Sequence, residues 1–142
     1  MNLNKKLKFS QGILEAYNYL LSNHKEFFVI GQGLWSPWYV GATMKDLDSK
    51  YGKDRVIDCP VSEYATTGAA VGASICGYRS MIVHPRIDFM LLAIDQIVTQ
   101  AAKWRYMFGG KSSAPVTFRG IINRGGEQGL SLIHISEPTR RS

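Results

Sequence analysis

The sequence has few of the features that mark secreted, metal-stapled or membrane-spanning proteins. Cys59 and Cys76 are its only cysteines, too few for a disulfide framework or for a structural zinc site with its four ligands. No apolar run of about 18 residues occurs, and the first residues lack the apolar stretch of a secretory signal. The 142 residues, 45% hydrophobic and 20% charged, are typical of an ordinary globular domain. A cytoplasmic, bacterial-type protein that does not enter a membrane is therefore expected.

Phosphate-binding loops and a strong charge are also lacking. No Gly-x-Gly-x-x-Gly or Walker-type loop follows a predicted strand, so this chain is not expected to cradle a phosphate. The net charge is +6, and four of these six charges come from the segments 5–8 and 137–141. The middle of the chain is too weakly basic to indicate nucleic acid binding.

Hydrophobic periodicity alternates between strand-like and helix-like segments. Short apolar runs predict strands, and apolar residues spaced by three and four predict helices. Ser10 is expected to cap the first helix and Gly52 to end the second. The predicted strands are 27–30, 55–58, 81–83 and 116–118, and the predicted helices are 11–21, 44–51, 64–75 and 90–106. This alternation predicts an α/β domain with a mostly parallel sheet covered by helices on both faces.

Two of the predicted helices have a distinctive composition. Helix 64–75 is rich in glycine, alanine and serine, and such small residues let another backbone or a flat ligand approach closely. In helix 90–106, one apolar face is formed by Leu91, Ile94, Val98 and Ala101.

Polar residues at the carboxyl ends of strands are candidates for a site, because α/β domains bind ligands there. Glu63 follows the second strand at the start of the small-residue helix. With Ser62 as the cap, Glu63 would simply complement the helix dipole. Alternatively, a poorly hydrated Glu63 would exchange a proton with a ligand nitrogen. His84 and Phe89, after the third strand, are more typical of packed residues than of catalytic ones.

Six short blocks, in their order and spacing, resemble the β subunit of the thiamine-diphosphate-dependent 2-oxo acid dehydrogenases. This subunit belongs to the decarboxylating component of the pyruvate and branched-chain complexes and of acetoin dehydrogenase. The blocks are Asp58-x-Pro60-x-Ser62-Glu63, Gly68-x-Ala70-x-Gly72-Ala73, Asp88-Phe89, Ala93-Ile94-Asp95-Gln96-Ile97-Val98, Gln100-Ala101-Ala102-Lys103 and Tyr106-Met107-x-Gly109-Gly110.

The resemblance implies a transketolase-like pyrimidine-binding domain, in which thiamine diphosphate lies between this chain and a partner α subunit. The family's motif glutamate falls on Glu63, where it would hydrogen-bond the ring nitrogen N1′ of the aminopyrimidine and so activate the cofactor. The aromatic residue that packs on the pyrimidine falls on Phe89. A potassium ion, held by backbone carbonyls in some members, would be bound in part at Val116. The diphosphate and its Mg²⁺ would be held by the α subunit.

The implied activity is the oxidative decarboxylation of a 2-oxo acid with acyl transfer to lipoamide. The implied partners are an α subunit, a second β subunit in an α2β2 heterotetramer, and the lipoyl acyltransferase core, with helix 90–106 lying between subunits. Gln32 stands where the family often has an acidic residue after the first strand. This departure keeps open another transketolase-like thiamine diphosphate synthase or transferase, and a non-catalytic scaffold or gene fragment is the remaining alternative.

The resemblance runs from about Phe9 to Gly129, so residues 1–129 are predicted to be a partial pyrimidine-binding domain. Members of the family continue into a histidine-containing loop and a second domain. Residues 130–142 instead resemble the translation of a sequencing adapter, so they are expected to be a non-native tail, and His134 is not taken as the loop histidine. The fold is therefore expected to be incomplete at its C-terminus, and the isolated chain is expected to be inactive.

Overall fold

A computed structural model describes residues 6–37 and 39–122 of the chain. The segment 130–142, expected to be a non-native tail, lies outside these described residues. Within them, four strands form one sheet in the order β2-β1-β3-β4, and every neighbouring pair is parallel. The strands are β1 Phe27–Gly31, β2 Val56–Asp58, β3 Arg79–His84 and β4 Val116–Gly120. The predicted mostly parallel sheet is therefore confirmed.

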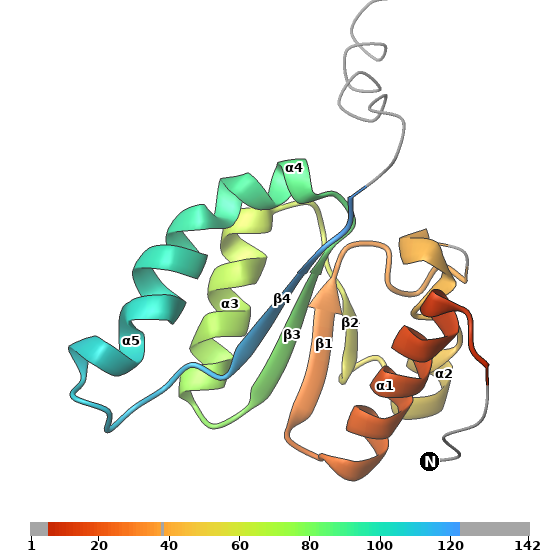
Figure 1. Ribbon diagram of the computed structural model, residues 1–142, viewed down its shortest axis with the longest axis horizontal. Helices are drawn as coiled ribbons and strands as arrows, with labels where there is room; N and C mark the ends of the chain where they lie inside the picture. The colour runs from red at the N-terminus through yellow and green to blue at the C-terminus, as the bar shows by residue number, and fades with distance from the viewer. Residues whose placement is uncertain (1–5, 38, 123–142) are drawn as a thin grey trace, which may run out of the picture.

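Helices cover both faces of this sheet, as predicted (Figure 1). On one face lie α1 (Phe9–Asn23), the short 3₁₀ turn η1 (Tyr39–Ala42) and α2 (Leu47–Tyr51). On the other face lies α3 (Glu63–Ile75), which packs against β3. A long helical segment then packs against α3, and it consists of α4 (Ile87–Met90), η2 (Leu91–Ala93), η3 (Asp95–Ala101) and α5 (Ala102–Met107).

Alternation along the strands supplies apolar side chains to both layers of the core, because successive residues of a strand point to opposite faces. Towards α1, the fully buried Val29 and Val56 pack with Tyr17 and Leu21. Towards α3, Ile82 packs with Ile30 and Ala70. Burying one such aliphatic side chain contributes about 1.5–3 kcal/mol, so these two layers fix the sheet between its helices.

Of the two expected helix ends, one is confirmed and the other is wrong. Gly52 is confirmed as the cap that ends α2, with a φ of 92° that favours glycine. The expected cap at Ser10 is wrong, because α1 begins at Phe9, two residues before the predicted start at residue 11. Lys8 occupies the capping position, and its backbone N–H donates to Gln11 Oε1 at 3.0 Å. The Gln11 side chain thus accepts the backbone N–H of the residue that precedes the helix, and Ser10 lies within the first turn.

The long helical segment does not bury its apolar face within the chain, which agrees with a helix that lies between subunits, and that placement stays a prediction. Its expected apolar face is exposed in the chain, with exposed fractions of 63% for Leu91, 50% for Ile94 and 46% for Val98. Instead, Ala93 is fully buried, and Gly68 of α3 lies against the Gln96 side chain. The segment passes through 3₁₀ and π turns, whose residues per turn differ from those of an α-helix and so change which side chains share a face.

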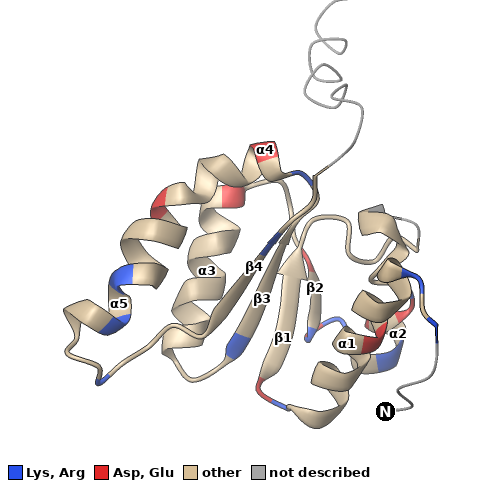
Figure 2. Cartoon of the chain, in the orientation of Figure 1, with Lys and Arg blue, Asp and Glu red and all other residues tan. Residues whose placement is uncertain are grey.

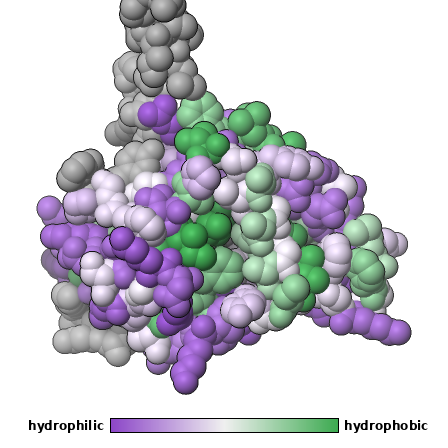
Figure 3. Space-filling view, turned by 180° about the vertical axis from the view of Figure 1, so that it is seen from behind, coloured by the Kyte–Doolittle hydropathy of each residue, from purple (hydrophilic) through white to green (hydrophobic). Residues whose placement is uncertain are grey.

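The exposed apolar side chains form part of a visible patch. Figure 3 shows hydrophobic residues along the upper border of the molecule, where Figure 1 places the helical segment that starts with α4. Charged residues are spread differently, since Lys and Arg occur on helices of both layers and on the strands (Figure 2). The small residues of α3 lie against η2 and η3 of the neighbouring helical segment. They thus allow another backbone to approach closely, which is one of the two possibilities that their composition indicated.

Gly31→Ala is expected to destabilise the fold, because the added Cβ would lie 2.5 Å from the Val83 carbonyl oxygen. Overpacking of this kind costs about 1–3 kcal/mol. Gly72→Ala is the matched control, since its Cβ would meet nothing within 4 Å and alanine is favoured over glycine in a helix by roughly 1 kcal/mol. Urea unfolding should move the free energies of unfolding of the two variants in opposite directions. Equal shifts would contradict the close approach of β1 and β3.

Candidate active site

The carboxyl ends of the strands meet at one edge of the sheet, where the chain leaves in two directions. After β1 it turns to η1 and α2 on one face, whereas after β2 and β3 it enters the helices of the opposite face. A crevice forms in α/β sheets where neighbouring connections diverge in this way, and ligands bind there. The residues directly after β1, β2 and β3 are therefore those that can build a site.

Glu63 is the central acidic residue of this edge. It is the first residue of α3, and only 6% of its surface is exposed. Gln32, which directly follows β1, donates from Nε2 to Glu63 Oε1 at 3.2 Å. Among residues 6–37 and 39–122, no other side chain donates to this carboxylate. One carboxylate oxygen is thus held by an amide, and the other remains available to a ligand.

Ser62 occupies the capping position of α3 without the expected hydrogen bond from its side chain. Its backbone carbonyl instead accepts from the Thr66 N–H at 2.9 Å and from Thr66 Oγ1 at 2.8 Å. Ser62 is therefore the predicted N-cap residue by position but not by its side chain, and Glu63 lies in the first turn as predicted, where a carboxylate favours the helix dipole. The dipole and a ligand can act on the same carboxylate, so the two interpretations of Glu63 do not exclude each other.

Asp58 fixes the loop that carries Gln32. Its Oδ1 accepts the Gly33 backbone N–H at 2.6 Å, which joins the ends of β1 and β2. Gly33 has a φ of 70°, a conformation that L side chains rarely adopt. Sequence reasoning missed both the Gln32–Glu63 and the Asp58–Gly33 contacts. The available signal was that Gln32, Gly33 and Asp58 end a strand or lie within two residues of its end, and that Glu63 begins the helix after β2.

His84 adds a buried imidazole at the end of β3. It is 1% exposed, and its Nε2 lies 3.2 Å from Oγ1 of the fully buried Thr67 in α3. Burial lowers the pKa of His84, and the nearby Glu63 carboxylate partly opposes this shift. The structure thus brings His84 close enough to Glu63 for their charges to interact, a pairing that the sequence did not indicate.

Phe89 lies at the same edge of the sheet as Glu63, in α4, which follows β3. Its side chain is partly buried, and the Arg86 guanidinium lies 5.6 Å from the centre of its ring. Placement at this edge is what a residue that stacks on a ligand requires. The stacking itself stays a prediction.

Val116, in contrast, lies at the opposite edge of the sheet, because it is the first residue of β4 and pairs with Ser80 near the start of β3. Its backbone N–H donates to the Ala114 carbonyl at 2.8 Å. A potassium ion at Val116 would therefore be separate from the Glu63 site, and this expectation also stays a prediction. In the part of the chain that the structure describes, no cluster of three His, Cys, Asp or Glu residues could hold a metal ion.

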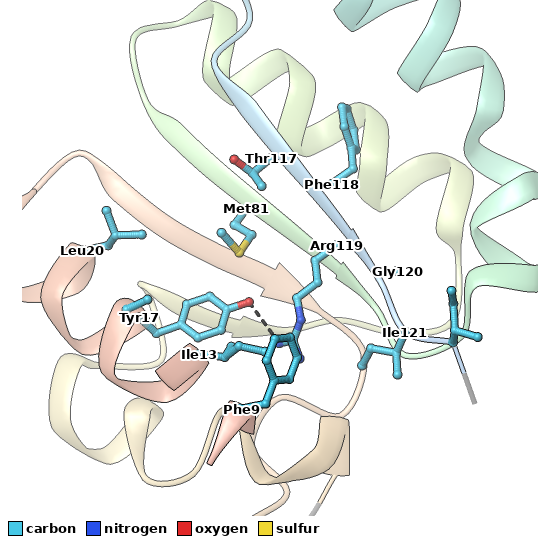
Figure 4. Close-up of a pocket in the computed structure, with 12 residues that line it drawn as sticks. Phe9, Ile13, Tyr17, Leu20, Met81, Thr117, Phe118, Arg119, Gly120 and Ile121 are labelled. Carbon is cyan, nitrogen blue, oxygen red and sulfur yellow. Dashed lines mark hydrogen bonds between the residues drawn. The ribbon is translucent and has the colours of Figure 1, made fainter. Parts of the chain in front are cut away.

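A cavity of about 620 Å³ lies between α1 and β4, away from Glu63. Its lining is mostly apolar, and Figure 4 shows Arg119 reaching towards Tyr17 within it. The guanidinium donates to Tyr17 Oη at 3.2 Å and to Thr43 Oγ1 at 2.9 Å. Burial raises the pKa of Tyr17, and the Arg119 charge opposes this shift. Among the described residues, β4 is the outermost strand of the sheet. The cavity lies where α1 covers the face of this strand only in part.

Comparison with known proteins shows the family of the chain. The profile of the family "Transketolase, pyrimidine binding domain" matches residues 5–131. The chain is 39% identical over 132 residues to the acetoin:2,6-dichlorophenolindophenol oxidoreductase subunit beta of Cupriavidus necator, covering 85% of this chain and 38% of that relative. It is 37% identical over 116 residues to the mitochondrial pyruvate dehydrogenase E1 component subunit beta of Bos taurus, covering 80% and 31%.

A pyruvate dehydrogenase E1 component subunit beta of Gracilaria tenuistipitata var. liui is 36% identical over 106 residues, covering 75% of this chain and 33% of that relative. The chain thus spans about a third of the length of the relatives that it matches. Within residues 6–37 and 39–122, no helix combines the length and the apolar character needed to cross a bilayer.

The stability of the chain is expected to fall in mildly acidic solution because of His84. Its pKa lies below the ordinary value of 6.5 in the folded chain, so the unfolded chain binds the proton more readily. The contribution of His84 to stability is therefore complete above pH 6.5 and is lost as the pH falls from there towards the folded pKa. Unfolding free energies measured between pH 7.5 and 5.5 should decline less in His84→Gln than in the unmodified chain. The same decline in both proteins would contradict the burial of a neutral imidazole.

Proposed function

This chain belongs to the transketolase pyrimidine-binding domain family, as the β subunits of 2-oxo acid dehydrogenases do, and we propose that it provides the pyrimidine half of a thiamine diphosphate site. The observation that carries the proposal is the buried Glu63 carboxylate, which has one oxygen held by Gln32 and the other left for a ligand. A carboxylate of this kind is suited to hold a proton on a ring nitrogen.

The described residues fit the pyrimidine end of the cofactor. Glu63 would bind N1′ of the aminopyrimidine and hold the shared proton there, and Phe89 would pack against the face of the ring. When bound, thiamine diphosphate supplies the electron sink for decarboxylation. The diphosphate and Mg²⁺ would be held by a partner α subunit, because no glycine-rich phosphate loop follows β1, β2 or β3. A potassium ion held in part by the Val116 carbonyl would lie at the start of β4, at the other edge of the sheet from Glu63.

The exposed apolar face of the helical segment supports a multi-subunit protein. Leu91, Leu92 and Ile94 are each at least half exposed, and contiguous apolar patches of this kind mark interaction sites. We expect this face to lie against other subunits of an α2β2 heterotetramer. The reaction would be the oxidative decarboxylation of a 2-oxo acid, with the acyl group passed to lipoamide on an acyltransferase core.

Two substrate classes are distinguished by a direct assay. The names of the relatives include acetoin, a hydroxyketone, and pyruvate, a 2-oxo acid. The complex of this chain, in its full natural length, with its α subunit should be given each compound in turn, with 2,6-dichlorophenolindophenol as the electron acceptor. Reduction of the dye by pyruvate alone supports the 2-oxo acid dehydrogenase, whereas reduction by acetoin alone would assign the acetoin reaction. Reduction by neither, without cofactor binding, would favour a non-catalytic scaffold.

Glu63→Gln is expected to abolish most of the activity of this complex, because the amide cannot hold the proton of the aminopyrimidine nitrogen. Loss of a group that transfers or holds a proton lowers kcat by about 10²- to 10⁴-fold. Glu26→Gln is the matched control, since Glu26 is a partly exposed carboxylate just before β1, at the opposite edge of the sheet. Steady-state kinetics should leave this control unchanged. Full activity of Glu63→Gln would remove Glu63 from the mechanism and favour the scaffold.

A further inference from the structure

We infer that Gln32 is a positioning residue, an uncharged donor that holds the Glu63 carboxylate so that one oxygen faces the cofactor. The inference rests on the proposed function, because it concerns the group that Glu63 would bind. It goes beyond that function by assigning a role to a residue of the loop after β1. Gln32 and Glu63 are 31 positions apart in the chain; Gln32 directly follows β1, and Glu63 begins α3.

The first argument is the geometry of the contact. The Gln32 Nε2 to Glu63 Oε1 distance is 3.2 Å, within hydrogen-bonding range. Because Glu63 is 94% buried, an unpartnered carboxylate there would lose its hydration without compensation. Gln32 offsets part of that cost and removes one of the two oxygens from competition for the ligand. The carboxylate therefore presents one oxygen in a fixed orientation.

The second argument is that the Gln32 backbone is itself held in place. On one side, Gly31 lies so close to β3 that a Cβ would meet the Val83 carbonyl. On the other side, the Gly33 N–H donates to Asp58 Oδ1. Further along the loop, Trp35 Nε1 donates to the Val56 carbonyl at 2.7 Å. The donor is thus fixed before any ligand binds, as a preorganised site requires.

The third argument is the chemistry of an amide. A glutamine side chain donates and accepts hydrogen bonds but does not gain or lose a proton near neutral pH. The proton shared between Glu63 and the ring nitrogen therefore cannot pass to Gln32. A carboxyl group at position 32 would behave differently, because two carboxyl groups at hydrogen-bonding distance repel each other when both are ionised and share a proton instead.

The other titratable groups around Glu63 are His84 from β3, Asp58 from β2 and Cys59 just after it. The charge of Glu63 raises the pKa of His84 against the effect of burial. It also raises the pKa of Cys59, which is raised mainly by burial. Asp58 is engaged by the Gly33 N–H. Gln32→Met adds no charge that could act on these groups, so its effect reports on the lost donor, whereas Gln32→Glu adds a charge that acts on all of them as well as on Glu63.

The test compares Gln32→Glu and Gln32→Met in the complete complex with the α subunit. Gln32→Met keeps the size of the side chain but removes the donor, so kcat and the affinity for thiamine diphosphate should each fall by about 10-fold, with KM for the substrate unchanged. Gln32→Glu should keep activity at high pH but move the acidic limb of the pH–kcat profile upwards by about one pH unit. Gln11→Glu, the same change on the exposed first turn of α1, is the control and should behave as the unmodified complex does.

Affinity is measured by titrating thiamine diphosphate against the melting temperature of each complex, a readout that does not depend on turnover. Unchanged kcat and affinity in Gln32→Met would overturn the inference, as would an unshifted pH profile in Gln32→Glu. A lower melting temperature without cofactor, together with an unshifted profile, would make Gln32 purely structural and also overturn it. Glu63→Gln is measured alongside. Full activity of that variant overturns the proposed function itself, whereas an inactive Glu63→Gln with normal Gln32 variants overturns only the positioning role.

Discussion

The parallel pairing of β1 with both of its neighbours governs the rest of the structure. Gly31 pairs with Asp58 of β2 on one side and with Val83 of β3 on the other. The three strands therefore end at nearly the same level, and the residues that follow them meet at one edge. The absence of a side chain at Gly31 permits this approach, because a Cβ would meet the Val83 carbonyl oxygen. The position of every candidate site residue at this edge depends on that register.

Burial then decides which polar groups this edge can contain. A buried carboxylate requires a partner, and the fold supplies Gln32 from the adjacent strand end. A buried imidazole disfavours its own charge, so His84 is held neutral against Thr67 while the Glu63 charge acts in the opposite sense. At this edge Asp58 is engaged by the Gly33 N–H, so Glu63 is the carboxylate whose second oxygen is left to hold a proton for a ligand.

Much of the fold was predictable from the sequence, because short apolar runs and helical spacing reflect how strands and helices are buried. The four strands, the parallel sheet and the cap at Gly52 follow from such local patterns. The cap expected at Ser10 was wrong, because Lys8 stands at that helix end and its N–H donates to Gln11. Ser62 does stand at the capping position of α3, but its side chain makes no cap hydrogen bond. The exposed apolar face of the 90–106 helix agrees with the expectation of a helix between subunits, but its 3₁₀ and π turns were not predicted, because the apolar spacing assumes an α-helix throughout.

Of the candidate site, the sequence predicted the residue types but not their partners. Glu63 was identifiable because it follows a strand and begins a helix, and the family resemblance added its role. The contact with Gln32 and the proximity of His84 were not predictable, since they join residues that are far apart in the chain and close only in the sheet. Val116 shows the converse limit. A backbone carbonyl has no side-chain signature, and only the strand register shows that it lies at the other edge.

The electrostatics of this edge also explain why one chain would provide only half of a cofactor site. Asp58 and Glu63 bring two carboxyl groups to the end of β2, and both would repel a diphosphate placed beside them. The group that holds a ring proton must be a buried base, whereas the group that holds a diphosphate must be cationic or rich in N–H donors. Under the proposed function, the two groups lie on separate chains, which avoids this conflict. The exposed apolar side chains of Leu91, Leu92 and Ile94 support this division, because a surface of that character is stabilised when another subunit covers it.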